Sequence, residues 1–504
     1  MQDGEVFDPP PDHTFWGARW HQTREHTVPL LLERLEEHGA VDNLRDLSAP
    51  RQGWWFADSD VHKWLEAAVR VDRLDLAEPV AEIIAAAQAP DGYLHSFFGD
   101  RRYERLDGSH ELYCMGHFIE AACAHHERTG SSWLLDVAVR AADHIVHEFG
   151  PGGEHEGATD GHPEIELALC ALTRVTGDRR YAAQARRFIR LLPDALERPG
   201  GHAVRALYFA TGAWDAAQLL DDDALADEVE QWWTELVETR MYVTGGVGGR
   251  WVSESIGRPY ELPNEMAYSE TCAAVAAARL ADRLGDTLTE RRIVHNALLA
   301  GVNQDGDSWF YSSPLAATHG NEVNPWQLGR DFSAGSLVQR FPARRLPWYD
   351  VTCCPTNLTR WLAALPGWQG VGDDPMAEAR AARPTIIHGH PRNEATRGCI
   401  AVQLGPFVMC AEEVDVPELA TSSVGIRAIE ATIDSPLHSS LDELAGPLPG
   451  VRVIAADLHW EGPAFGGREV VGEARSVPLV PYFAWANRSV GAMTVWFRNL
   501  GNVH

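Results

Sequence analysis

The sequence has little of what exported and membrane-bound proteins need. No stretch approaches the roughly 18 consecutive apolar residues of a membrane-spanning helix. The N-terminus, MQDGEVFDPPPDHTFWGARW, lacks the basic segment and following apolar run that mark a secretory signal peptide. We therefore expect a cytoplasmic protein without a membrane partner.

Basic residues are scarce as well. Lys and Arg number 43 against 72 Asp and Glu, which gives a formal net charge of −29. Because nucleic acids and anionic membranes are bound through basic surfaces, this balance argues against both as partners. The length of 504 residues predicts two or more domains, and 45% apolar residues are typical of a soluble globular protein.

Cysteine is also infrequent, with eight residues, and without a signal peptide these are expected to be reduced thiols. Two of them, Cys353 and Cys354, are adjacent in YDVTCCPTN (349–357). Adjacent cysteines rarely bond to each other because the resulting ring is strained. This pair must therefore pair elsewhere, bind a metal, take part in chemistry or fill space.

Helical periodicity dominates residues 1–368, where about twelve short segments follow one another. The segment REHTVPLLLERLEEHG (24–39) is typical, with apolar residues at three- and four-residue intervals and a glycine stop. Short turns join several of these segments, as antiparallel helix pairs require. Twelve paired helices predict an (α/α)6 toroid over residues 1–368.

The residue pattern changes after residue 368. The stretches 397–414, 450–460, 476–486 and 491–499 are rich in β-branched and aromatic residues and are bounded by Gly and Pro. They predict a smaller all-β, sandwich-like domain over 397–504. Residues 369–396 show little strand pattern, so we expect a linker or the remnant of a shortened β-region there.

A second cysteine signal lies in LPNEMAYSETCAAVAAARLADRLGD (262–286), where Glu270 and Cys272 are separated by one residue. On a regular helix such positions lie about 200° apart, so the pair can converge only at an irregular helix start. With Cys353 and Cys354 they would form a carboxylate and three thiolates, a credible tetrahedral zinc set. The alternative from the residues alone is that Cys272 packs as a small hydrophobe on an alanine-rich face.

Two further features favour a ligand cleft. The loop YVTGGVGGRWVSESIGRPYEL (242–262) carries Glu254 and has four glycines in five positions, which suggests a tight turn or close approach to a ligand. His117, His162 and His202 each fall near the start of a predicted helix, so in a toroid they could surround one mouth. Each histidine taken alone is better explained by a structural role, and it is the similar position of all three that favours a cleft.

Many stretches together resemble glycoside hydrolase family 127, the β-L-arabinofuranosidases. The resemblance includes FADSDVHKWLEAA, HELYCMGHFIEAACAH, GHPEIELAL, YVTGGVGG, AYSETCAA, WFYSSPL and CCPTNLTRWLAALPG, and it resumes in RGCIAVQLGPFVMCAEEVD. It implies an (α/α)6 catalytic domain followed by β-sandwich domains. It also implies a retaining enzyme for small saccharides or glycosides that binds zinc through one Glu and three Cys.

Matching the motifs assigns roles to individual residues. The resemblance implies that the zinc ligands are Glu270, Cys272, Cys353 and Cys354, that Cys353 is the nucleophile and that Glu254 is the general acid/base. It also implies that His117, His162, His202 and Tyr311 contact the sugar.

The chain departs from the family pattern after Trp368. The family continues there through a long strand-rich stretch, whereas here the short segment 369–396 leads directly to RGCIAVQLG. We therefore expect that much of one β-domain is missing. Such a deletion would expose helical surface that a second subunit of a homo-oligomer could cover.

Two other functions fit parts of the sequence. A sugar epimerase or isomerase on an (α/α)6 toroid would use the histidines for proton transfer, but it leaves the four ligand residues without a role. A non-catalytic sugar-binding protein with a structural zinc would account for those four residues, but it leaves Glu254 unexplained.

Overall fold

The computed structural model describes residues 9–317, 344–349, 351–365, 371–372, 374–420, 422–437 and 446–501. The expected domain boundary after residue 368 lies outside these residues. Among the described residues, no helix is both long and apolar enough to cross a lipid bilayer.

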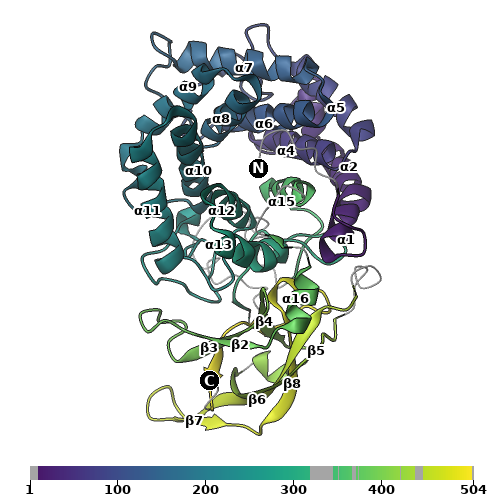
Figure 1. Cartoon of the computed structure of the whole chain (residues 1–504), viewed down its shortest axis with the longest axis vertical. Coiled ribbons are helices and arrows are strands. Elements are labelled where there is room, and N and C mark those ends of the chain that lie inside the picture. The colour runs from purple at the N-terminus through teal and green to yellow at the C-terminus, as the bar shows by residue number, and fades with distance from the viewer. Residues whose placement is uncertain are drawn as a thin grey trace.

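Six helices form an inner ring in the upper part of the molecule (Figure 1). Each packs on the next, and the last packs on the first. The ring is made of α4 (Ala57–Arg70), α6 (Glu111–Thr129), α8 (Ile165–Thr176), α10 (Ala203–Leu220), α12 (Thr271–Leu284) and α15 (Cys353–Ala363). This closed ring is the inner layer of the predicted (α/α)6 toroid.

The outer layer pairs one helix with each inner helix. It consists of α5 (Leu74–Ala87), α7 (Trp133–Phe149), α9 (Arg179–Arg190), α11 (Asp223–Thr239), α13 (Thr287–Arg292) with its π-helical continuation η5 (Ile293–Leu298), and the N-terminal α1 (Phe15–Gln22), η1 (Thr23–Thr27) and α2 (Val28–Glu37). The short α3 (Ala40–Arg45) leads back to α4. In α7 the buried residues recur at helical spacing, which fixes the face turned to the core.

The connections at the two ends of the toroid differ in length. Turns from an inner to an outer helix take two or three residues, and Gly130, Gly177 and Gly285 end three inner helices in the left-handed conformation. The connections back to the inner helices are long and span 88–110, 150–164, 191–202, 240–270 and 299–352. The N-terminal ends of the inner helices therefore open under the long loops, where a site can be built.

The C-terminal part is one ten-stranded sheet with the order β1-β9-β4-β8-β6-β5-β10-β3-β2, with β7 on β6. An additional β3–β4 pairing closes the path through six strands. Its strands are β1 (Ala316–Ala317), β2 (Thr385–His388), β3 (Cys399–Leu404), β4 (Phe407–Glu412), β5 (Ser423–Asp434), β6 (Pro449–Glu461), β7 (Arg468–Val471), β8 (Arg475–Pro481), β9 (Met493–Thr494) and β10 (Phe497–Asn499).

Part of the segment expected to be a linker is regular structure. Helix α16 (Pro375–Ala381) begins at Asp374, whose side chain accepts from two backbone N–H groups, and β2 pairs antiparallel with β3. The interpretation of these residues as a loop was therefore wrong. The four residues of β2 are too few to show alternation in the sequence, and their strand conformation is stabilised by pairing with β3.

The toroid and the sheet are tied together by buried polar contacts. Strand β1, which follows the last outer helix in sequence, pairs with β9. The guanidinium of Arg345 donates to the backbone carbonyls of Ala300, Phe483 and Trp485 at 2.6–3.0 Å. The side-chain amide of Asn296 likewise bonds to the backbone of the β3–β4 turn and of β4.

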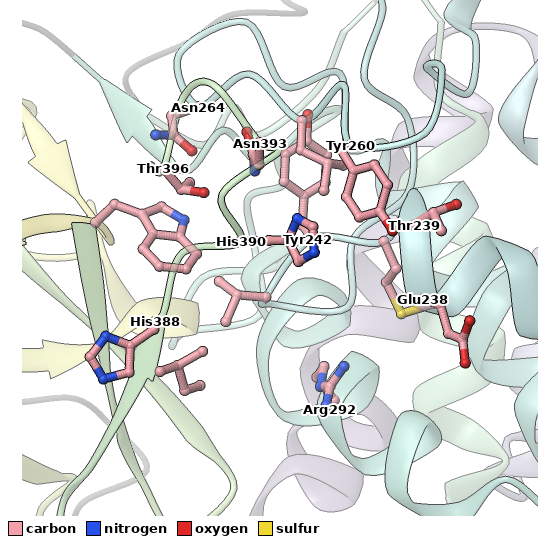
Figure 2. A pocket seen from close by; sticks show the side chains of 15 residues that line it. Glu238, Thr239, Tyr242, Tyr260, Asn264, Arg292, His388, His390, Asn393 and Thr396 are labelled. Carbon is pink, nitrogen blue, oxygen red and sulfur yellow. The ribbon is translucent and has the colours of Figure 1, made fainter. Parts of the chain in front are cut away.

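A cavity of about 210 Å³ lies along this junction (Figure 2). Tyr260, from the loop that also carries Glu254, stacks on His390 with ring centres 4.4 Å apart, and Arg392 lies over the same ring at 4.2 Å. Stacking and cation–π contacts of this kind stabilise the loop against the β-domain. The β-domain therefore braces a loop that bears a candidate catalytic residue.

Candidate active site

The residues with candidate chemical roles gather at the N-terminal ends of the inner helices. Cys353 and Cys354 are the first residues of α15, Glu270 is the N-cap of α12 and Cys272 lies in its first turn. His202 is the N-cap of α10. Helix N-termini carry unpaired N–H groups and a partial positive charge, which favour thiolates and carboxylates.

The convergence required of Glu270 and Cys272 occurs at an irregular helix start. Glu270 has an extended backbone (φ −66°, ψ 141°), whereas Cys272 is already helical. No side chain caps this helix end. The change of conformation between the two residues turns both side chains toward one point.

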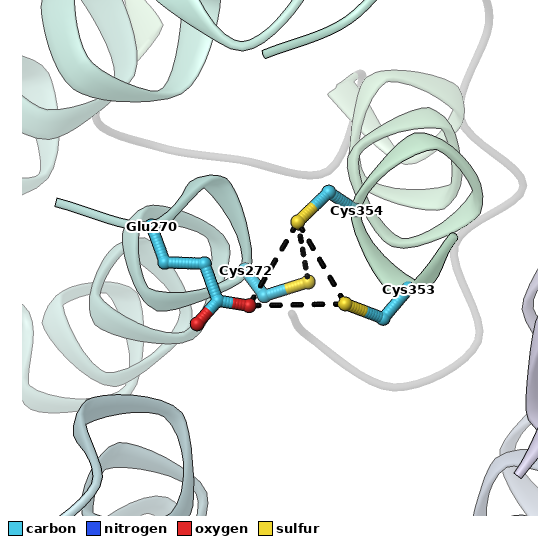
Figure 3. Close-up of side chains that lie close together, drawn as sticks. All are labelled: Glu270, Cys272, Cys353 and Cys354. Carbon is cyan, nitrogen blue, oxygen red and sulfur yellow. Dashed lines mark hydrogen bonds between the residues drawn. The ribbon is translucent and has the colours of Figure 1, made fainter. Parts of the chain in front are cut away.

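Four side chains meet there (Figure 3). The Sγ atom of Cys354 lies 3.5 Å from that of Cys272 and 3.8 Å from that of Cys353. Glu270 Oε1 is 3.8 Å from the sulfurs of Cys353 and Cys354, and all four donor atoms lie within 4.8 Å of one another. The structure thus brings together all four of the expected metal ligands.

The spacing of these atoms fits a tetrahedral metal ion. Zn–S distances of about 2.3 Å place two sulfur ligands about 3.8 Å apart in a tetrahedron, close to the observed separations. Three thiols with one carboxylate form a soft donor set that suits zinc. All eight cysteines are free of disulfide bonds, so the sulfurs are available as ligands.

The electrostatics of the three thiols also favour a bound cation. Burial, the largest influence, raises the pKa of the Cys272 thiol, but hydrogen bonds from Cys353 and Cys354 outweigh it and lower this pKa to about 6. The hydrogen bond to Cys272 raises the pKa of Cys353, and burial raises the pKa of Cys354. A bound cation would favour deprotonation of all three thiols.

A hydrogen-bonded chain joins this group to Glu254. The Tyr268 hydroxyl donates to Glu270 Oε2 at 2.7 Å and lies 3.4 Å from the Tyr311 hydroxyl. Tyr311 in turn donates to Glu254 Oε1 at 3.4 Å. The other oxygen of Glu254 is 2.7 Å from His202 Nε2, and both of these side chains are 20% exposed. Glu254 therefore faces the group across two tyrosines while remaining accessible.

The backbone of Glu254 is unusual. Both Ser253 and Glu254 have left-handed conformations, with φ of 58° and 51°. Non-glycine residues rarely adopt such angles, and clusters of them occur where a side chain must be aimed at a function. Both residues lie in the loop that Tyr260 anchors to the β-domain, and this anchoring stabilises their strained conformation.

The three histidines do not all reach the same space. The His162 ring lies 5.8 Å from that of His202, and His202 contacts Glu254. His117 is fully buried, and Tyr113 lies between it and His162 with ring-centre distances of 4.5 and 4.4 Å. His202 is partly exposed beside Glu254, whereas His117 and His162 are buried, and contact with a sugar stays a prediction for all three.

His117 belongs instead to a buried polar network. Its Nδ1 lies 3.1 Å from Glu164 Oε1, and Glu164 neighbours Glu120. Glu120 also pairs with Arg279 and, at 2.8 Å, with Arg360. Burial and the nearby Glu120 raise the pKa of Glu164, so these two carboxyls share a proton. The network fixes the relative positions of the inner helices beneath the site.

Sequence reasoning missed the residues that support the site. Tyr268 and Tyr113 lie within motifs that were singled out for their neighbours, and Tyr113 is one turn before His117. Lys63 is fully buried with its Nζ 3.3 Å from Asp60, and its charge lowers the pKa of the cysteine thiols as a lesser cause. The signal in the sequence that could have revealed Lys63 is the lysine itself, placed within an amphipathic helical pattern.

Comparison with known proteins agrees with this geometry. Residues 12–367 match the family model described as the β-L-arabinofuranosidase GH127 catalytic domain, and residues 384–498 match the glycoside hydrolase family 127 C-terminal domain. The non-reducing end β-L-arabinofuranosidase of Bifidobacterium longum subsp. longum is 28% identical over 620 positions, which cover 91% of this chain and 92% of that protein.

Two solved structures have the same fold throughout. The GH127 β-L-arabinofuranosidase Ara127N of Geobacillus stearothermophilus T6 superposes with a TM-score of 0.81 at 25% identity, covering 97% of this chain and 99% of that chain. The GH127 β-arabinofuranosidase BT3674 gives a TM-score of 0.79 at 25% identity, with 99% of each chain covered.

The Bifidobacterium alignment bears on the shortened β-region. Its 620 positions exceed the 504 residues of this chain, so that relative has segments without a counterpart here. The two family matches leave residues 368–383 between them. Loss of a β-domain at this join stays a prediction.

Proposed function

This chain belongs to glycoside hydrolase family 127, and from this premise we propose that it releases L-arabinofuranose from β-linked arabinofuranosides with retention of configuration. It is a glycosidase, and its substrate is a saccharide. Family membership argues against the epimerase alternative, which also leaves the Glu–Cys group without a role.

One observation carries the choice of nucleophile. Among the four clustered side chains, Glu270, Cys272 and Cys354 are buried, whereas Cys353 is partly exposed. Cys353 is therefore the member of the group that is most open to an approaching substrate. The second cysteine of the pair faces inward and would only anchor the metal.

The donor set fits zinc held by Glu270, Cys272, Cys353 and Cys354. When bound, zinc would keep the thiols deprotonated at neutral pH and make the Cys353 sulfur a better leaving group. Tyr268 would orient Glu270 through its hydrogen bond to Oε2, in the way that outer hydrogen bonds commonly orient metal ligands.

In the first step, the Cys353 thiolate attacks the anomeric carbon and a C–S bond replaces the glycosidic C–O bond. Glu254 gives its proton to the departing oxygen. In the second step, Glu254 takes a proton from water, the water oxygen bonds to the anomeric carbon, and the C–S electrons return to sulfur. Two inversions at one carbon give net retention. Tyr311 and His202 hold the two Glu254 oxygens in position for both transfers.

The test is hydrolysis of p-nitrophenyl β-L-arabinofuranoside by the purified protein, with bound zinc measured in parallel. We expect turnover with about one zinc per chain, a product first formed as the β-anomer by NMR, and loss of turnover in Cys353→Ser. Cys399→Ser is the matched control, because Cys399 is also partly exposed but lies on β3 outside the group. Undiminished turnover in Cys353→Ser would overturn the nucleophile assignment.

A further inference from the structure

A row of rings leads away from Glu254 at the open end of the toroid. His202 contacts Glu254 at 2.7 Å, and its ring lies 5.8 Å from that of His162. His162 is followed by His110, the N-cap of α6, at 5.3 Å between ring centres. The row thus starts at the residue that would protonate the leaving group and runs outward.

The outer end of this row is a pair of exposed tryptophans. The indole Nε1 of Trp55 lies 3.4 Å from His110 Nδ1, and the ring of Phe56 is 5.3 Å from that of His110. Trp54 stacks parallel to Phe56 at 6.0 Å, with an interplanar angle of 4°. Trp54 is 40% exposed and Trp55 37%. Phe56 directly precedes α4, so the pair stands at the same end of the toroid as the Glu–Cys group.

The rings are held in place without being covered. Phe56 supports one face of Trp54, and Trp55 meets Trp54 edge-on at 5.4 Å with an angle of 76°. An indole fixed in this way offers a flat apolar surface beside a polar N–H, the combination that suits the C–H face and hydroxyls of a sugar ring. Single exposed apolar residues are common, but two adjacent fixed indoles continuous with a site are not explained by chance exposure.

We propose that Trp54 and Trp55 form the binding site for a second sugar ring, the one attached through the oxygen that leaves. The proposal rests on the proposed function, because a leaving group protonated by Glu254 must lie on the Glu254 side of the scissile bond. The row of rings begins at His202, which contacts Glu254.

The experiment compares two substrates, methyl β-L-arabinofuranoside and a β-L-arabinofuranosyl disaccharide. For each variant, kcat/KM is expressed relative to the parent enzyme on the same substrate, which cancels the difference between the leaving groups. Trp54→Ala and Trp55→Ala should each lower kcat/KM for the disaccharide about three- to tenfold more than for the methyl glycoside. Trp55→Phe should recover part of the loss because it restores a flat ring.

The matched control is Trp460→Ala, which removes a tryptophan that is 54% exposed on β6, in the β-domain. It should affect neither substrate. Trp54→Leu covers the case in which the alanine variant does not fold, because leucine keeps an apolar contact with Phe56 and lacks the flat face. Equal losses on both substrates, or no loss on the disaccharide, would overturn the proposal.

Failure of the proposed function gives a different result. If the parent enzyme cleaves neither glycoside, the proposed activity is wrong. Calorimetric titration with the disaccharide then tests the tryptophan site independently of the activity. Weaker binding by the Trp54→Ala, Trp55→Ala double variant than by the parent supports the site. Equal or undetectable binding in both overturns it.

Discussion

Replacement of Glu254 by glutamine separates its proposed chemical role from its structural one. Glutamine has the same size and keeps an oxygen that can accept from His202 Nε2 or the Tyr311 hydroxyl. Since the side chain is 20% exposed, we expect the free energy of unfolding to change by no more than about 0.5 kcal/mol. The amide, however, can neither give a proton to a leaving oxygen nor take one from water.

The magnitude follows from these two losses. General acid–base catalysis contributes roughly 10²- to 10⁴-fold, or about 3–5 kcal/mol of transition-state stabilisation. Methyl β-L-arabinofuranoside needs the acid because methoxide is a poor leaving group, so its kcat/KM should fall toward the upper end of that range. A 2,4-dinitrophenyl arabinofuranoside needs no protonation, so its first step should be nearly unchanged.

The assay is pre-steady-state release of dinitrophenol, followed by intact-protein mass spectrometry. The glycosyl–Cys353 intermediate should accumulate because deprotonation of water is slow without Glu254. Azide needs no general base, so it should restore turnover and give the β-configured arabinofuranosyl azide. Glu265→Gln, an exposed glutamate of the same loop, is the control and should show neither the burst nor an azide response. Equal losses on both substrates without an effect of azide would refute the acid/base role.

Three further predictions concern the support of the site. Cys272→Ser should reduce bound zinc well below one per chain and abolish turnover, and metal analysis showing full zinc content would contradict the ligand set. Tyr268→Phe removes the hydrogen bond to Glu270 and should weaken zinc affinity about 10- to 100-fold in competition with a chelator, and unchanged affinity would contradict its orienting role. Arg360→Met removes one partner from each of the buried Glu66 and Glu120, which keep Arg70 and Arg279, and should lower the free energy of unfolding by about 1.5–3 kcal/mol in urea titrations. A loss below about 1 kcal/mol would mean that solvent already reaches this network.

The toroid could be predicted because its information is local. Helical periodicity extends through 1–368, and short turns with glycine stops place consecutive helices antiparallel. The β-domain carried less local information. Strand β5 (Ser423–Asp434) was not predicted, because exposed polar residues occupy much of its length and its conformation is stabilised by pairing with β6. The α16–β2 segment was missed for the same reason, since a four-residue strand is defined by its neighbour.

Local sequence patterns likewise predicted only part of the candidate site. Helix geometry shows that Glu270 and Cys272 can converge only at an irregular helix start, whereas their meeting with Cys353 and Cys354 was one of two interpretations of the residues until the resemblance favoured it. Nothing local joins residues 80 positions apart in sequence, because the closure of the ring between α12 and α15 brings them together. The burial of His117 could not be predicted either, because it depends on Glu164 from the next inner helix.

The connectivity of the toroid explains why the site lies where it does. Two- and three-residue turns at one end leave no backbone free to form a cleft. At the other end, the long connections supply Glu254 and Tyr311, and the α3–α4 connection (46–56) supplies the tryptophan pair. That end also gathers the N-termini of the six inner helices, whose partial positive charges favour the buried anions of Glu270 and the thiolates. The loops therefore determine which sugar can enter, and the helix ends determine which chemistry it meets. Substitutions that change substrate choice should consequently fall in the long connections, and those that abolish turnover on every substrate should fall in the loop residue Glu254 and in the first turns of α12 and α15.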